Sequence, residues 1–318
     1  MMSNPENVPA DTVATSRPDP HAVHSSAVPA TTPAARSSSR PRWAKWGLRA
    51  LSTIVALLIA VAFTDSLVAG RTEHLYSKAL YDQSNLANPP AVFVAGSPYT
   101  AAALTHEVQA ITVNAKDVDM PGWGLMSVHK SAQYVTLPWQ AVFGQSFTNA
   151  PAKKVFTRLQ LDGVTIGGKM HVDDLLIQNR DDISPRGGWE TEAIFEGTPK
   201  GFDAPATVEM KLRVKEGDVY LTPTRVIRGP SSEAGEGVLS TVKTVDGDKL
   251  DDQLKKRIER AFTLKIPGER LPLKEKPKRV YVAGGSVFFE SEQLYTTVSL
   301  QDLIPQGRRL PEEEKPGL

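Results

Sequence analysis

The chain has 318 residues, 37 basic and 36 acidic side chains, a formal net charge of +1 and no cysteine. Nucleic-acid-binding proteins carry a concentrated basic excess, and none is found after residue 70, so we predict no nucleic-acid partner. The absence of cysteine excludes disulfides, thiolate metal sites and cysteine nucleophiles, and it leaves the cellular compartment open.

Residues 1–45 are expected to form a disordered cytoplasmic tail. The first 42 residues are rich in Pro, Ala, Ser and Thr, and such a segment has little apolar surface to offset the entropy of ordering. Its acidic residues lie early, whereas its basic residues gather beside the apolar segment that follows. These basic residues are Arg36, Arg40, Arg42, Lys45 and Arg49.

Residues 46–70 are predicted to form a transmembrane signal-anchor helix. The uncharged segment 50–64 is shorter than the about 20 residues that a span needs. Trp43 and Trp46 extend it on one side, and Leu67 and Val68 extend it beyond Asp65. Flanking Trp and basic residues are typical of a spanning helix. The basic flank predicts a single-pass protein of the cell membrane, with a cytoplasmic N-terminus and everything after residue 70 outside.

Two other interpretations of this apolar segment were weighed. Ala60-Val61-Ala62 resembles the cleavage site of a secretory signal peptide, but the preceding segment is much longer than an ordinary n-region. A buried core helix is the second alternative, and a disordered basic flank beside such a helix would be unusual. Both alternatives are therefore less favoured than an anchor.

Residues 71–305 are expected to form one β-rich domain. A helix over 71–85 ends before Pro89-Pro90, and short strands follow at 92–94 and 109–115. Residues 208–214 alternate strictly between apolar and charged side chains, which predicts a half-buried strand. Residues 216–218 turn this strand into a hairpin with Val219 and Leu221, and residues 280–300 continue as a meander.

One later helix is predicted from an apolar stripe, capped by Asp246 or Asp248 and covering one face of a sheet. A loop over 229–237 and a disordered tail over 306–318 are also expected. Because the helices are few and lie at the ends of runs of strands, the fold class is α+β with mostly antiparallel strands. The stripe consists of Leu250, Leu254, Ile258, Ala261 and Phe262.

No catalytic motif occurs in the sequence: it has no nucleophile elbow, P-loop or dinucleotide fingerprint. His171-Val172-Asp173-Asp174 is the densest polar cluster, and it lacks the paired histidines of a zinc helix. We therefore predict no enzyme, no catalytic residue, no metal and no cofactor. The alternative is a hydrolase with an unrecognised site at His129, His171, Asp173 or Asp174.

The order of elements resembles the LmeA-like phospholipid-binding family of actinobacterial envelope proteins, of the mycobacterial lipomannan elongation activator type. The resemblance covers residues 67–303. It rests on an N-terminal helix, the strand and turn at 92–99, the strand at 111–113, and a late element at 262–287 that contains Leu271-Pro272. Pro98-Tyr99-Thr100 and the small residues 101–103 depart from the Pro-Phe-Leu turn and following glutamine of the family.

The resemblance implies binding of a phospholipid, with inositol-containing lipids as candidates, and a role in envelope glycolipid assembly or lipid presentation. It also implies a curved β-meander packed on a few helices, as in tubular lipid-binding folds. An open groove could take acyl chains at ~0.8 kcal/mol per buried methylene, and arginines at its rim could pair with the phosphate. The alternative is a closed core in an envelope scaffold that binds another membrane protein. The candidate lipid-binding residues are Tyr99, Val219, Leu221, Arg225 and Arg228.

Overall fold

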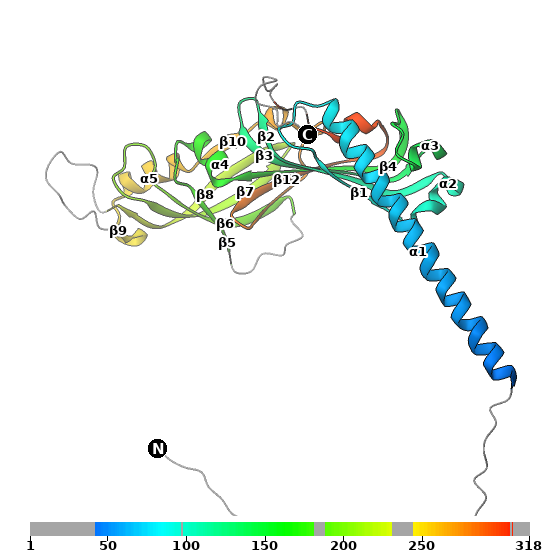
Figure 1. Cartoon of the computed structure of the whole chain (residues 1–318). Helices are drawn as coiled ribbons and strands as arrows, with labels where there is room; N and C mark the ends of the chain where they lie inside the picture. The colour runs from blue at the N-terminus through cyan, green and yellow to red at the C-terminus, as the bar shows by residue number, and fades with distance from the viewer. Residues whose placement is uncertain (1–41, 97, 181–187, 231–243, 306, 308–318) are drawn as a thin grey trace, which may run out of the picture. The chain divides into compact units, whose positions relative to one another are not determined.

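The computed structural model describes residues 42–96, 98–180, 188–230, 244–305 and 307 (Figure 1). Of the tails expected at 1–45 and 306–318, residues 1–41, 306 and 308–318 lie outside the described residues. The loop expected at 229–237 also lies outside them, apart from its first two residues. Within them, a long apolar N-terminal helix is followed by two antiparallel sheets that do not close into a barrel. The predicted α+β class is confirmed.

Helix α1 (Arg42–Asp82) joins the predicted span and the predicted helix after residue 71 into one element. It begins four residues earlier than the span expected at 46–70. In the described part of the chain, it is the one helix long and apolar enough to cross a membrane by length and composition. Leu58 and Phe63 are 63% and 66% exposed, whereas Thr72, Tyr76 and Leu80 are buried. The helix therefore changes from an all-round apolar rod to an amphipathic helix that packs on the domain.

The first sheet contains six strands, each antiparallel to its neighbours. Its long strands β2 and β3 form a hairpin, and β4 and β12 continue the sheet from β3. One face bears the alternating buried side chains of β2, including Ile111, Val113 and Ala115, and we call it the inner face. In spatial order, the strands are β1 (Ala91–Ala95), β2 (Glu107–Met120), β3 (Gly124–Thr136), β4 (Ala150–Asp162), β12 (Ser286–Val298) and β11 (Arg279–Ala283).

Helix α1 protects the free edge of β1. The Val94 backbone N–H donates to Glu73 Oε1 at 2.9 Å, and Ser77 Oγ donates to the Pro90 carbonyl oxygen at 2.6 Å. A sheet edge with unpaired N–H and C=O groups is a template for aggregation. These two side chains of α1 thus occupy backbone groups that a further strand would otherwise pair with.

The second sheet contains the hairpin that the alternating pattern predicted. Val208, Met210 and Leu212 are buried, and the turn pairs Lys215 with Asp218 across Glu216 and Gly217, both with positive φ. That prediction is confirmed. In spatial order, the strands are β10 (Leu264–Ile266), β8 (Asp218–Pro230), β7 (Ala206–Lys215), β6 (Glu190–Gly197) and β5 (Leu176–Asn179), and β9 (Thr244–Asp246) pairs with β8.

Helix α5 (Asp252–Ala261) is the predicted later helix, but its cap differs from the prediction. Asp251 Oδ2 accepts from the Gln253 N–H at 2.9 Å, whereas Asp246 caps the short helix η2 (Gly247–Lys249) before it. Ile258 packs on β8 at Gly229, where a Cβ would lie 2.8 Å from Ile258 Cδ1. The remaining short helices are η1 (Tyr99–Ala101), α2 (Ala102–Thr105), α3 (Trp139–Val142), α4 (Gly163–Met170), η3 (Gly268–Arg270) and η4 (Leu300–Leu303).

Both sheets share one hydrophobic core. It combines buried side chains of α1, the inner face of the first sheet, the second sheet and α5. The Val280 N–H of β11 donates to the Gly188 carbonyl oxygen at 2.9 Å, which joins the edge of the first sheet to the segment before β6. The described strands of the two sheets are therefore joined through one core.

Candidate functional site

A lysine interrupts the apolar inner face of the first sheet. Lys130 on β3 points to the same side as Val128 and Ala132, because side chains two positions apart in a strand share a face. It lies opposite Val113 of β2 and opposite Thr157 of β4. A charged side chain among buried valines and alanines is unusual, because burying an ammonium is unfavourable without compensating partners.

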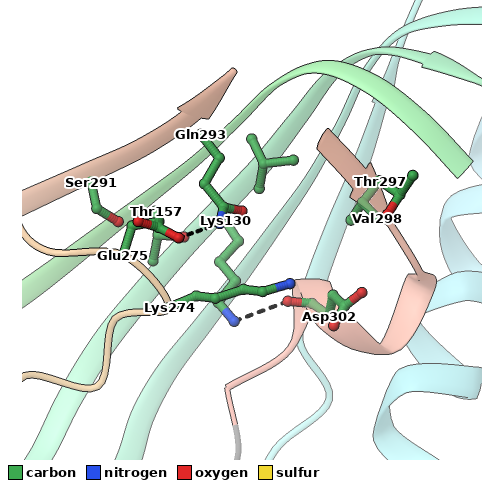
Figure 2. A pocket seen from close by; sticks show the side chains of 10 residues that line it. Lys130, Thr157, Lys274, Glu275, Ser291, Gln293, Thr297, Val298 and Asp302 are labelled. Carbon is green, nitrogen blue, oxygen red and sulfur yellow. Dashed lines mark hydrogen bonds between the residues drawn. The ribbon is translucent and has the colours of Figure 1, made fainter. Parts of the chain in front are cut away.

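The Lys130 side chain opens into a small cavity, which we call the Lys130 slot (Figure 2). Its volume is about 20 Å³, which is enough for about one water molecule. In Figure 2 the Lys130 and Lys274 side chains both extend toward Asp302. The slot is lined by Lys130, Val155, Thr157, Lys274, Glu275, Ser291, Gln293, Thr297, Val298 and Asp302.

Two backbone carbonyl groups hold the Lys130 ammonium in place. Lys130 Nζ donates to the carbonyl oxygen of Asp302 at 3.0 Å and to that of Ile304 at 3.4 Å. Burial lowers the pKa of Lys130 to about 8, an effect that the charge of Asp302 opposes and that of Lys274 reinforces. Perturbed lysines of this kind are concentrated at functional sites, where a partner of opposite charge completes the environment.

The slot brings hydrogen-bond donors together with two carboxylates. Within the described residues, the exposed Lys274 and the buried residues Thr157 and Ser291 line the slot and can donate hydrogen bonds into it. The acidic groups are already engaged. Glu275 Oε1 accepts from Gln293 Nε2 at 2.8 Å, and Asp302 Oδ2 accepts from the Ser299 N–H at 2.8 Å. Two ammonium groups and two hydroxyls form a set of donors suited to a phosphate or another oxyanion.

The lowered pKa of Lys130 predicts a pH dependence of stability. Between about pH 8 and about pH 10.4 the unfolded chain binds the proton that folded Lys130 has lost, so stability rises with pH. We expect the wild-type chain to gain on the order of 1–2 kcal/mol relative to Lys130→Met from about pH 7 to about pH 10. Denaturant unfolding in detergent, repeated at several pH values, measures this difference. Parallel pH profiles for the two chains would contradict the burial of a titrating ammonium.

Tyr99, the first of the predicted lipid-binding residues, lies outside the Lys130 slot. Its backbone N–H donates to Asp65 Oδ2 and its hydroxyl donates to the Val142 carbonyl oxygen, both at 2.8 Å. Burial raises the pKa of Tyr99 to about 12. The side chain is 2% exposed, so in this structure it ties η1 to α1 and α3.

The other four predicted residues share strand β8 of the second sheet. Val219 and Leu221 are fully buried in the core. Arg225 and Arg228 are exposed, and Arg225 Nε lies 3.3 Å from Glu209 Oε2. None of these four residues lines the Lys130 slot. The side-chain hydrogen bonds of Arg225 go to Glu209 and not to Tyr99. Their contact with a lipid stays a prediction.

Sequence reasoning missed Lys130 and Lys274. The strand expected at Ser127–Val135, which contains Lys130, has polar residues on both faces. Its sequence therefore does not show which face is buried. Lys274 lies in an irregular segment before β11, far from Lys130 in sequence. A core-facing lysine could have been suspected only from its position between Val128 and Ala132.

Two of the four candidate hydrolytic residues, His129 and Asp174, have side-chain hydrogen-bond partners. His129 lies on the face opposite Lys130, paired through Nδ1 with Asn114 Oδ1, and burial lowers its pKa. Asp174 Oδ1 accepts from the Thr198 N–H at 2.6 Å and Asp174 Oδ2 from the Thr198 hydroxyl at 2.8 Å. His171 ends α4 in a left-handed conformation, with φ of 60°. Among the described residues, no group of three His, Asp or Glu side chains could hold a metal ion.

Comparison with known proteins gives one family match. The model of a family described as LmeA-like phospholipid-binding matches residues 63–292, well over half of the chain. The matched region begins at the end of the apolar half of α1 and contains Lys130, Lys274 and Ser291. No curated protein and no solved structure matches the chain.

Proposed function

Since this chain belongs to the LmeA-like phospholipid-binding family, we propose that it is a membrane-anchored protein that holds a phospholipid by its phosphate at the Lys130 slot and catalyses no reaction. The observation that carries this proposal is the cluster of donors in the slot: two ammonium groups and two hydroxyls lie beside two carboxylates that each already accept a hydrogen bond. The phosphate of a phospholipid supplies acceptor oxygens and a negative charge to these donors.

Binding of a phosphate offsets the unfavourable burial of Lys130. The ammonium is partly desolvated and has only carbonyl oxygens as hydrogen-bond partners. An anion beside it favours the charged form and raises its pKa again. Each charge-assisted hydrogen bond contributes about 1.5–3 kcal/mol, so contacts from Lys130 and Lys274 together are enough for selective retention of a lipid.

Access to the slot requires movement of the segment that carries Lys274. The cavity of about 20 Å³ takes one water molecule, which is less than a phosphate group needs. Lys274 and Glu275 lie between η3 and β11, where the chain has no regular structure, and Gln293 holds Glu275 by one hydrogen bond. Displacement of this segment opens the slot without breaking a strand pair.

The helix and the family support a proposal for the cellular role. We propose that α1 anchors the chain in the cell membrane with the N-terminus in the cytoplasm and the β-rich domain outside, as its basic flank predicts. The domain then presents phospholipid, with inositol-containing lipids as the first candidates, to envelope glycolipid assembly. Tyr99, Val219, Leu221, Arg225 and Arg228 stay in this proposal as further lipid contacts.

Native mass spectrometry of the full-length chain, released from nanodiscs of phosphatidylcholine, phosphatidylglycerol and phosphatidylinositol, tests the proposal. We expect each chain to retain one anionic phospholipid at a collisional activation energy that removes phosphatidylcholine from α1. The lipid mass distinguishes inositol from glycerol head groups. A chain that loses all of its lipid under this activation would point instead to a scaffold that binds another membrane protein. The filled core is compatible with such a scaffold.

A further inference from the structure

Three large apolar side chains are exposed on the two short helices beside α1. Leu104 of α2 is 86% exposed, Trp139 of α3 is 54% exposed, and Phe143, which ends α3, is 43% exposed. The rings of Trp139 and Phe143 pack edge to face with their centroids 6.3 Å apart, and α2 packs against α3. We call these three residues the α2–α3 patch. A cluster of this kind on a soluble surface is typical of an interaction site.

Hydrogen bonds fix the patch to α1 at the end of its apolar half. Asp65 Oδ1 accepts from the Thr100 N–H at 2.6 Å and from the Thr100 hydroxyl at 2.7 Å, and Asp65 Oδ2 accepts from the Tyr99 N–H. Asp65 therefore caps the η1–α2 segment from another helix. On the other side, Thr72 Oγ1 donates to the Val142 carbonyl oxygen at 2.9 Å, which ties α3 to α1.

The position of Asp65 sets the level of the patch relative to the apolar half of α1. Phe63, which is 66% exposed, precedes Asp65 by two residues, so the two lie about 3 Å apart along the helix axis. The segment that carries the patch is thus held beside the last turn of the exposed apolar surface of α1, which extends to Leu67, 60% exposed. Trp side chains are enriched at this level of membrane proteins, because the ring is apolar and its N–H is polar.

We propose that the α2–α3 patch is a second membrane contact, seated in the interfacial layer of the same bilayer that α1 crosses. This inference rests on the proposed anchoring of α1. The occupant is a lipid surface rather than a protein, because the patch continues the apolar surface of α1 and is held at its end by Asp65 and Thr72. The domain is then attached at two places, and its rotation about α1 is restricted.

Labelling at single cysteines tests this contact in the full-length chain, which has no cysteine of its own. The variants Leu104→Cys, Trp139→Cys and Phe143→Cys each carry a fluorophore whose emission shifts to the blue in an apolar environment. Each variant is reconstituted in phosphatidylcholine vesicles with and without a spin-labelled lipid that quenches near the head groups. We expect a blue shift and a several-fold loss of emission at all three positions.

Control positions separate the patch from the anchor. Val164→Cys on α4 and Leu176→Cys on β5 replace side chains that are 70% and 58% exposed, and we expect neither label to be quenched. Leu58→Cys reports on α1 itself and is expected to be strongly quenched by lipids labelled deep in the bilayer. Quenching at Leu58→Cys with patch labels that behave like Val164→Cys would overturn this inference and leave the anchor in place. An unquenched label at Leu58→Cys would overturn the anchor and, with it, this inference.

Discussion

Replacing Lys130 by methionine is expected to lower the affinity for an anionic phospholipid by about 10- to 100-fold, because a charge-assisted hydrogen bond contributes about 1.5–3 kcal/mol. The same variant is expected to be at least as stable as the wild-type chain near neutral pH. Methionine is similar in length and needs no compensation for a desolvated charge, whereas Lys130 in the folded chain titrates at a pKa of about 8. Loss of affinity with a gain in stability is the signature of a ligand-binding group that the fold itself does not need.

Titration of nanodiscs that contain a fixed fraction of phosphatidylinositol measures the affinity, and denaturant unfolding measures the stability. Lys153→Met is the matched control, since Lys153 lies on β4 of the same sheet, is exposed, and pairs with Glu107 at 3.2 Å outside the slot. Lys274→Met is expected to lower the affinity with little change in stability. Unchanged lipid affinity in both Lys130→Met and Lys274→Met would rule out the slot as the phosphate site.

Replacing Tyr76 by alanine is expected to destabilise the domain by about 3–5 kcal/mol, the usual cost of truncating a buried aromatic side chain. Tyr76 has no exposed surface, packs edge to face on Phe147 with centroids 5.9 Å apart, and donates its hydroxyl to the Ala141 carbonyl oxygen. Burial raises the pKa of Tyr76 well above its ordinary value, consistent with a hydroxyl closed off from water. The truncation removes one of the contacts between α1 and α3, and the hydrogen bond from Thr72 to Val142 remains.

Tyr76→Phe separates the two contributions, because it keeps the ring and removes the hydroxyl. We expect it to cost about 1 kcal/mol, the net contribution of one hydrogen bond, plus the penalty of leaving the Ala141 carbonyl unpaired. Guanidinium unfolding in detergent gives the order wild type, Tyr76→Phe, Tyr76→Ala. An alanine variant that unfolds at the same denaturant concentration as the wild type would show that the Tyr76 side chain contributes no packing energy to the domain.

Sequence patterns predicted the elements whose signal is local. The alternation of Val208, Met210 and Leu212 predicted β7, and the stripe through Leu254 and Ile258 predicted α5. Both could be predicted because buried residues recur every two positions in a strand and about every 3.6 positions in a helix. The helix after residue 71 was predicted as well, and α1 includes it to Asp82. Caps were less predictable, since several aspartates in a row compete for one position.

The candidate site was not predictable in the same way. Lys130, Lys274 and Asp302 meet only because β3, the segment before β11, and η4 come together in the folded domain. Asp65 was noticed as an acid near the end of the apolar run, and its role as a cap for Thr100 depends on a contact across 35 positions. Contacts between residues so far apart in the chain produce no periodic pattern in a single sequence.

The continuity of α1 has a consequence for membranes of different thickness. A helix whose apolar stretch is longer than the local hydrocarbon layer tilts to bury it, and the tilt changes as the bilayer thins or thickens. Because Asp65, Thr72, Glu73 and Ser77 tie residues 65–77 of α1 to the domain, that part of the helix has no hinge at the membrane surface. A change of tilt at residues 54–64 is therefore passed to the sheets as a rotation of the same size. Under the proposed anchoring of α1, the thickness of the bilayer would therefore set the height of the Lys130 slot above the head groups.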